Sequence, residues 1–460
     1  MARRVFPALA VSALVAWSLF AFGSVYRWTA WPTMIGAVLL ALVETPRFGG
    51  TRALRRFDAA LFLFLAAAAM QIVPLPPALR DVLSPRLAAF DALYRVDAGL
   101  GDSPASHAAR PLTLSPESTA YVLLFIASIF LIFWTCRTTL ATGGARRLAR
   151  AVSWLGLAAA LIAIVQRALS PGLVYGFWHP LEDGAQPFGP IINRNHFATW
   201  MILALPICLG YLAAHARTHR SRRPLPFSFV RALRMANSRV LWLWAAGAMM
   251  LLAVTLTASR AALMSLALSA GVGVWLRRRR RDWKGRWTLG VYAALAAIVL
   301  LAWANFGAIV LRLDEFTAAG PGGRTLIWRD TIAVARDFWL TGVGLGSYQT
   351  AMAVYQTTMR EYIFNHAHNQ YLQLAAEGGL LLVVPAGLAL AAFALAATER
   401  LRHDSSPMWN LRVGALTGVV AVAVQSVWEC GLITPANGVL LAVAAAMVLH
   451  RVPPAEETPS

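Results

Sequence analysis

Long apolar stretches, separated by polar segments, recur along the whole chain. A helix needs about 20 mostly apolar residues to cross the hydrocarbon core of a bilayer. Twelve stretches are predicted to do so: 7–25, 29–44, 58–75, 119–136, 151–167, 196–215, 239–257, 261–276, 287–305, 371–397, 412–430 and 434–450. The first resembles a secretory signal peptide, but the second follows almost at once, so an uncleaved first helix is favoured. The pattern predicts an all-α, polytopic membrane protein with about 12 transmembrane helices.

Composition supports this interpretation and excludes other classes. Hydrophobic residues make up 58% of the 460 residues, charged residues only 13%, and mean hydropathy is +0.58. Soluble domains carry about 25% charged residues, so a cytosolic globular protein is excluded. The three cysteines, Cys136, Cys208 and Cys430, form no CxxC pair, which argues against a disulfide framework and a zinc or iron–sulfur site.

The distribution of basic residues predicts the orientation. With the N-terminus in the cytoplasm, 28 of the 41 Lys and Arg residues fall in cytoplasmic segments, and basic and acidic residues balance on the opposite side. This is the positive-inside pattern. It explains the net charge of +20 without a nucleic-acid partner and places both termini in the cytoplasm.

Three long segments are then predicted on the outer side, at 76–118, 168–195 and 306–370. The last contains an amphipathic stretch from Leu326 to Trp339, which predicts a helix within the loop. No internal repeat and no duplicated pair of broken helices is present, which weakens a secondary-transporter interpretation.

Two arginines stand out on this outer side, which the basic excess avoids. Arg260 lies in a nearly absent turn between two apolar stretches, and Arg324 follows a glycine pair before the amphipathic helix. A guanidinium group binds phosphate in a bidentate manner, and a helix start adds backbone donors. Each taken alone is also explained as a snorkelling or surface arginine.

A polar cluster around His366, His368 and Asn369 leads directly into an apolar helix. Of three interpretations of this cluster, acid–base chemistry at the membrane surface is favoured over a helix cap and over a metal site. The nearby acids Glu361 and Glu377 lack metal-ligand spacing.

Two further places carry polar groups at the outer membrane boundary. Arg194 and Asn195 open an apolar stretch, where capping of the helix and substrate contact are equally supported. Glu429 is predicted near the outer end of the stretch 412–430. An intramembrane carboxylate indicates function or a pairing role with an arginine.

Together these residues predict an outer-face site with two arginines and a histidine. Two guanidinium groups suit a pyrophosphate, and a histidine suits deprotonation of a hydroxyl near neutral pH. Lipid-linked sugar pyrophosphates present such a leaving group at a membrane surface.

The order of several short motifs resembles the O-antigen ligase and polymerase superfamily of bacterial envelope membrane proteins. The resemblance covers about residues 190–440, and its motifs are Asn193–Ala198, Ser259–Ala262, Gly323–Arg324 with Trp328, Leu340–Gly346, His366–Asn369 with Tyr371, Leu372 and Glu377–Gly379, and Thr434–Asn437. It divides the chain into N-terminal helices and loops (1–190), a ligase-like region (191–450) and a cytoplasmic tail (451–460). Leu382 stands where the ligase pattern has a second glycine after Gly379, which leaves ligase and polymerase both open.

The resemblance implies a GT-C-like, metal-independent, inverting glycosyltransferase of the bacterial inner membrane with a periplasmic active site and no cofactor. Its donor would be an undecaprenyl-pyrophosphate-linked glycan, and its acceptor lipid A-core or another glycan. His368 corresponds to the proposed base, and Arg260 and Arg324 to the arginines that hold the pyrophosphate. His366, Asn369, Arg194, Asn195, Glu377 and Glu429 are further candidate substrate contacts. Protein O-glycosylation, exopolysaccharide polymerisation, a polysaccharide or lipid transporter and a non-catalytic assembly partner remain alternatives.

Overall fold

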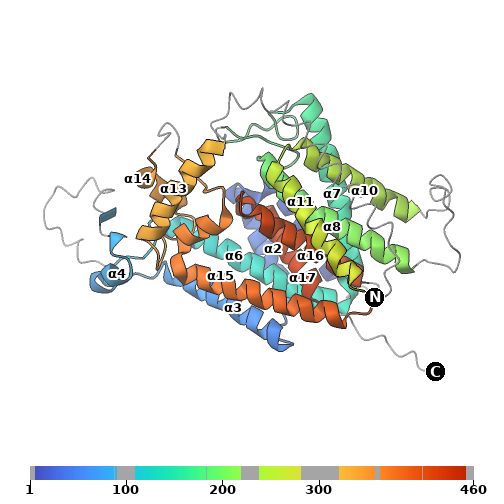
Figure 1. The fold of residues 1–460 in the computed structure, drawn as a ribbon, viewed down its shortest axis with the longest axis horizontal. Coiled ribbons are helices and arrows are strands. Elements are labelled where there is room, and N and C mark those ends of the chain that lie inside the picture. Colours follow the sequence, from blue (N-terminus) through green and yellow to red (C-terminus); the bar gives the residue numbers. More distant parts are fainter. Residues whose placement is uncertain are drawn as a thin grey trace.

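The computed structural model of the protein is helical throughout the part of the chain that it describes. That part comprises residues 6–87, 89–90, 109–182, 184–218, 238–280, 321–357, 363–406 and 408–451. Its helices are α1 (Phe6–Phe20), α2 (Arg27–Val43), α3 (Arg52–Met70), α4 (Pro77–Leu83), α6 (Pro116–Thr139), α7 (Ala145–Leu169), α8 (Arg194–Thr218), α10 (Ser238–Leu256), α11 (Arg260–Arg278), α13 (Pro321–Asp337), α14 (Tyr348–Tyr355), α15 (Gln370–His403), α16 (Trp409–Gln425) and α17 (Pro435–Leu449) (Figure 1). Extended pairing within these ranges is limited to isolated bridges. The predicted all-α fold is confirmed.

Helices occupy eleven of the twelve predicted apolar stretches, and the stretch 287–305 lies outside the described residues. Among the helices described, α6, α7, α8 and α15 are long and apolar enough to cross a membrane. Four shorter apolar helices are α1, α2, the Val240–Leu256 part of α10, and α17. The chain is therefore a multi-pass membrane protein, while the count of twelve spans stays a prediction.

One helix boundary changes the setting of a candidate residue. The apolar run 412–430 contains no glycine or proline near its end to mark a stop, but α16 ends at Gln425. Glu429 consequently lies in the connection between α16 and the short 3-10 turn Gly431–Ile433, and not inside a helix.

Helix α8 lies at the centre of the bundle. The most apolar window of α8 is 89% buried, whereas those of α6, α7 and α15 are less than half buried. A helix that is apolar on all sides is expected to be enclosed by other helices, and α16, α10, α7 and α17 surround α8.

Glycines bring α8 and α16 into backbone contact. A Cβ atom added to Gly414 would lie 2.2 Å from the Pro206 carbonyl oxygen, and one added to Gly418 would lie 2.7 Å from that of Leu203. Small residues allow this close approach between membrane helices. Residue numbers that increase along α16 meet residue numbers that decrease along α8. The two helices are therefore antiparallel, and the start of α8 lies beside the end of α16.

Helix α15 is broken near its start, and a glycine-rich loop completes its hydrogen bonds. Gly379 has φ +52°, and a Cβ there would lie 2.6 Å from the backbone of Leu340. The N–H groups of Leu380 and Leu381 donate to carbonyls of Trp339 and Leu340, and those of Val343 and Gly344 donate to carbonyls of Ala376 and Glu377. The loop 340–346 thereby fixes the segment after α13 against the first turns of α15.

Figure 1 shows α4, α13 and α14 together at one end of the long helices. They share a small apolar core with residues from the preceding loop, which includes Leu87, Leu112, Val334, Phe338, Tyr348 and Met352. The amphipathic stretch predicted from Leu326 to Trp339 thus corresponds mainly to α13, whose Val334 packs in this core, and α13 lies against α15.

Buried ion pairs fix the opposite end of the bundle. Arg137 lies 2.6 Å from Asp58, and Arg412 lies 3.0 Å from Asp404 at the start of α16. Arg280 donates to the Asp404 carbonyl, which places the end of α11 beside the start of α16. Helix α11 is therefore antiparallel to α16, and its first residue points toward the end of the bundle that carries Glu429.

Candidate functional site

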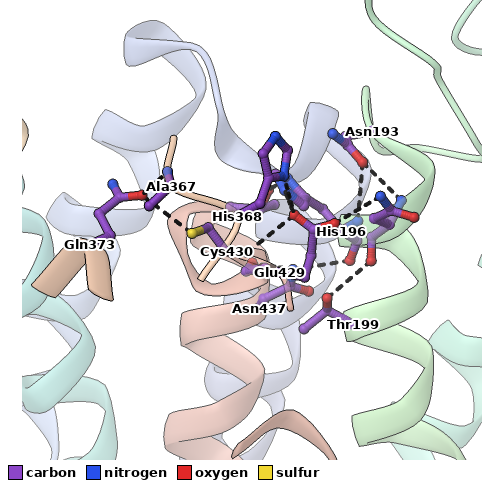
Figure 2. A network of polar contacts seen from close by, with 12 residues as sticks. Asn193, His196, Thr199, Ala367, His368, Gln373, Glu429, Cys430 and Asn437 are labelled. Atoms are coloured by element: carbon purple, nitrogen blue, oxygen red, sulfur yellow. Dashed lines mark hydrogen bonds and ion pairs between the residues drawn. The ribbon is translucent and has the colours of Figure 1, made fainter. Parts of the chain in front are cut away.

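Glu429 is the centre of a network of polar contacts where α8, α15 and α16 meet (Figure 2). Its side chain is 2% exposed. Asn195 Nδ2 donates to Oε2 over 2.8 Å, and the backbone N–H of Cys430 donates to Oε1 over 3.1 Å. A buried carboxylate needs such partners, since an unpaired one is costly.

His368 completes this network from the segment before α15. Its Nδ1 atom lies 3.2 Å from Glu429 Oε1, and its side chain is 35% exposed. Burial acts to raise the pKa of Glu429, but the hydrogen bond from His368 and the charges of His368, His196 and Arg324 outweigh burial and lower it to about 2. The carboxylate is therefore ionised and only accepts, so the hydrogen of the contact between His368 and Glu429 lies on Nδ1.

Two backbone features hold His368 in this orientation. Ala367 donates its N–H to Gln373 Oε1 and accepts at its carbonyl from Trp328 Nε1. Asn369 caps α15 by accepting from the N–H of Leu372. Between them His368 adopts φ +49°, a left-handed conformation that is uncommon outside glycine.

Arg324 reaches the same carboxylate from α13. Its guanidinium Nη2 lies 3.7 Å from Glu429 Oε2, and its side chain is 34% exposed. Trp328 lies four residues later, hence on the same face of α13, and its bond to Ala367 aims this face at the histidine segment. Arg324 is therefore part of the site and retains a solvent-accessible surface.

His196, in the first turn of α8, is a second imidazole near Glu429. Its Nε2 atom is 3.8 Å from Glu429 Oε1, and its Nδ1 atom is 2.7 Å from Thr434 Oγ1. Asn437 Nδ2 donates to the His196 carbonyl, which ties α17 to the start of α8. Asn193, not Arg194 or Asn195, caps α8 by accepting from the N–H groups of Asn195 and His196.

His366 is a third imidazole in this cluster. Burial lowers its pKa to about 3, the charges of His196 and His368 act in the same direction, and that of Glu429 opposes them. Its Nδ1 atom is buried and meets no hydrogen-bond partner among the residues that the structure describes. His366 is therefore neutral and offers an unused ring nitrogen.

The remaining candidates are Glu377, Arg194 and Arg260. The Glu377 carboxylate is buried in α15, where it accepts from the backbone N–H groups of Gly346 and Tyr348 and from Gln373 Nε2. Arg194 is the exposed first residue of α8, and Arg260 is the exposed first residue of α11. The antiparallel packing of α11 places Arg260 at the same end of the bundle as Glu429.

Within the described ranges, no group of three or more His, Cys, Asp or Glu side chains is arranged to hold a metal ion. The absence of a metal from the reaction stays a prediction. The network instead combines one carboxylate with cationic or neutral donors, an arrangement suited to moving a proton and holding an anion.

Sequence reasoning did not identify His196 as part of the site, although it lies in the quoted motif Asn193–Ala198. The signal was its place three residues after a capping asparagine, in the first turn of a long apolar helix that is the most buried of the four long apolar helices described. It also did not foresee that Glu429 pairs with His368, because the pairing arises where the start of α15 contacts the end of α16 through the bonds from Gln370 and Tyr371.

Comparison with known protein families gives a match to one segment of the chain. Residues 245–390 match the model of the O-antigen ligase family, which confirms the resemblance to the O-antigen ligase superfamily. The match includes Arg260, Arg324, His366 and His368 but ends before Glu429. A search of curated proteins gave no match. The finding supports a membrane enzyme of O-antigen ligase or polymerase type.

Proposed function

We propose, starting from the O-antigen ligase family that residues 245–390 match, that the protein transfers a glycan from undecaprenyl pyrophosphate to an acceptor hydroxyl. The acceptor is lipid A-core or a related glycan, and the reaction takes place on the periplasmic face of the inner membrane. It is metal-independent and inverts the configuration of the anomeric carbon.

The contact between His368 and Glu429 carries this proposal. The ionised carboxylate fixes the hydrogen on Nδ1, which leaves Nε2 of a partly exposed imidazole as a base. Nε2 takes the proton of the acceptor hydroxyl while its oxygen attacks the anomeric carbon. The bond from that carbon to the pyrophosphate oxygen breaks, and Glu429 stabilises the imidazolium that forms.

The arginines are proposed to hold the departing pyrophosphate. Arg324 contacts Glu429 only at 3.7 Å and is one-third exposed, so its other guanidinium nitrogens remain available to an anion. Arg260 begins α11 at the same end of the bundle. Preorganised cations at the leaving group lower the barrier because they meet charge that grows as the bond breaks.

The experiment compares His368→Ala, His366→Ala and His403→Ala in glycan transfer from lipid-linked donor by purified protein. His403 is an exposed histidine in the last turn of α15 and serves as the matched control. Loss of a positioned base is expected to lower transfer roughly 10²–10⁴-fold in His368→Ala. His366→Ala should lose less, and His403→Ala nothing.

Donor binding by His368→Ala should persist, because the arginines remain. Parent-like transfer by His368→Ala would refute base catalysis by this residue. Loss in His366→Ala with activity in His368→Ala would reassign the base to His366.

Polymerase activity is the second candidate, because Leu382 replaces the second glycine of the ligase pattern. Leu382 is fully buried and packs beside Leu345 in a small apolar cluster. The two functions differ in product: a ligase attaches glycans to a new acceptor, whereas a polymerase lengthens the lipid-linked glycan. Separation of the products by size and by attached lipid distinguishes them.

A further inference from the structure

A cavity of about 170 Å³ lies between α7, α8 and α10, away from the polar network around Glu429. Its lining is Arg150, Trp154, Tyr211, His215, Trp242 and Leu243. None of these residues takes part in the chemistry proposed above, and the cavity has no assigned role.

The cavity lies at the opposite end of the helices from Glu429. His196 and His215 both belong to α8, and 19 intervening steps of 1.5 Å separate them by roughly 30 Å along the helix axis. This distance is about the thickness of the hydrocarbon core. The cavity therefore faces the other surface of the bilayer.

The lining combines positive charge with aromatic surface. Arg150 lines the cavity and is exposed, and the rings of His215 and Tyr211 lie 6.3 Å apart between centroids. Trp154 and Trp242 stack with their ring centroids 4.4 Å apart, and Trp154 is half exposed. Tryptophans are enriched where a helix leaves the hydrocarbon core, since one edge is apolar and the other polar.

No carboxylate balances this charge on the three helices. The segments of α7, α8 and α10 contain no Asp or Glu, while α7 also carries Arg146 and Arg147 in the turn before Arg150. Among the residues described, none forms an ion pair with Arg150. The cavity is therefore complementary to an anion.

We propose that this cavity binds the phosphate headgroup of an anionic membrane phospholipid. Arg150 pairs with the phosphate, while His215 and Tyr211 donate to its remaining oxygens. The stacked tryptophans line the passage to the glycerol and acyl chains. A lipid is favoured over free phosphate because the cavity opens beside exposed tryptophan surface at a bilayer boundary, where basic pockets between helices bind anionic lipids.

The test measures binding of phosphatidylglycerol and phosphatidylcholine to the full chain in detergent by native mass spectrometry. The variants are Arg150→Gln and Trp154→Ala, with Arg146→Gln as the control. Arg146 is exposed on the same helix but does not line the cavity. Its replacement therefore removes the same charge as Arg150→Gln without changing the cavity.

Phosphatidylglycerol should bind the parent in preference to phosphatidylcholine, and Arg150→Gln should weaken it roughly five- to tenfold, as expected for one arginine contact. Trp154→Ala should weaken it as well, and Arg146→Gln should not. Equal loss in the two arginine variants would overturn the proposal in favour of diffuse surface attraction. Equal binding of both lipids, or displacement by millimolar inorganic phosphate, would also overturn it.

Discussion

Replacing Glu429 with Gln removes the negative charge at the centre of the site and almost nothing else. The amide has the same shape, but it offers one acceptor oxygen where the carboxylate offers two. Oε1 accepts from His368 and Cys430, and Oε2 accepts from Asn195 and lies near Arg324. The single amide oxygen can therefore accept either from His368 and Cys430 or from Asn195, but not from both sets.

Both orientations of the amide disturb the base. If its oxygen faces His368, its NH₂ group meets Asn195 Nδ2, which donates at 2.8 Å in the parent. If its NH₂ group faces His368, the hydrogen of the imidazole must move to Nε2, and the lone pair that would accept the acceptor proton is lost. In either case the imidazolium lacks its counter-charge. We expect Glu429→Gln to lower single-turnover transfer roughly 10²–10⁴-fold.

The assay follows a labelled glycan from lipid-linked donor to acceptor, with donor binding and thermal melting measured on the same preparations. Asn195→Ala is the control, because it removes one donor to Oε2 and leaves the carboxylate and the His368 contact. It should lose far less activity than Glu429→Gln. Parent-like transfer by a folded Glu429→Gln protein would refute the role of the carboxylate in orienting His368.

Three further predictions follow from the same geometry. Arg260→Lys and Arg324→Lys should each lose most transfer, because an ammonium group cannot reproduce bidentate pyrophosphate binding; a fully active lysine variant would remove that arginine from the site. Transfer by purified protein should persist in excess chelator, and loss restored by one divalent ion would instead indicate a metal site. The parent should lose stability as pH falls below about 6.5, because His366 is neutral in the folded state with a pKa of about 3 but protonates near 6.5 when unfolded, a cost of about 1.4 kcal/mol per pH unit between these values. The melting temperature of His366→Gln should therefore fall less than that of the parent on acidification, and equal falls would contradict the assigned burial.

Apolar length was enough to locate the helices but not all their ends. The predicted stretch 371–397 lies within α15, and 151–167 lies within α7. The start of α3 lies six residues before the predicted 58–75, because Thr51 caps it and buried Asp58 pairs with Arg137. Such tertiary contacts allow charged residues inside a buried helix, and a count of apolar residues cannot register them.

The candidate site was predictable as a set of chemical types on one side, but not as a set of contacts. His368 and Arg324 were selected because imidazole and guanidinium at helix starts suit acid–base chemistry and anion binding. Their meeting at Glu429 depends on tertiary bonds, from the Gln370 N–H to the Ser426 carbonyl and from Trp328 Nε1 to the Ala367 carbonyl. Helical periodicity says which face of a helix is apolar, but not which helix will cover it.

The left-handed backbone of His368 is a physical sign that the contact between His368 and Glu429 has a function. A left-handed conformation costs a residue with a Cβ atom about 1–2 kcal/mol, which glycine would avoid. The bonds of Ala367 to Gln373 and Trp328, and the bond from the Gln370 N–H to the Ser426 carbonyl, hold both sides of the histidine in place. His368 Nδ1 contacts Glu429 in this conformation, so the strained backbone lies at the residue that we propose as the base. Strain of this kind persists where surrounding contacts enforce it, and it gathers at active sites.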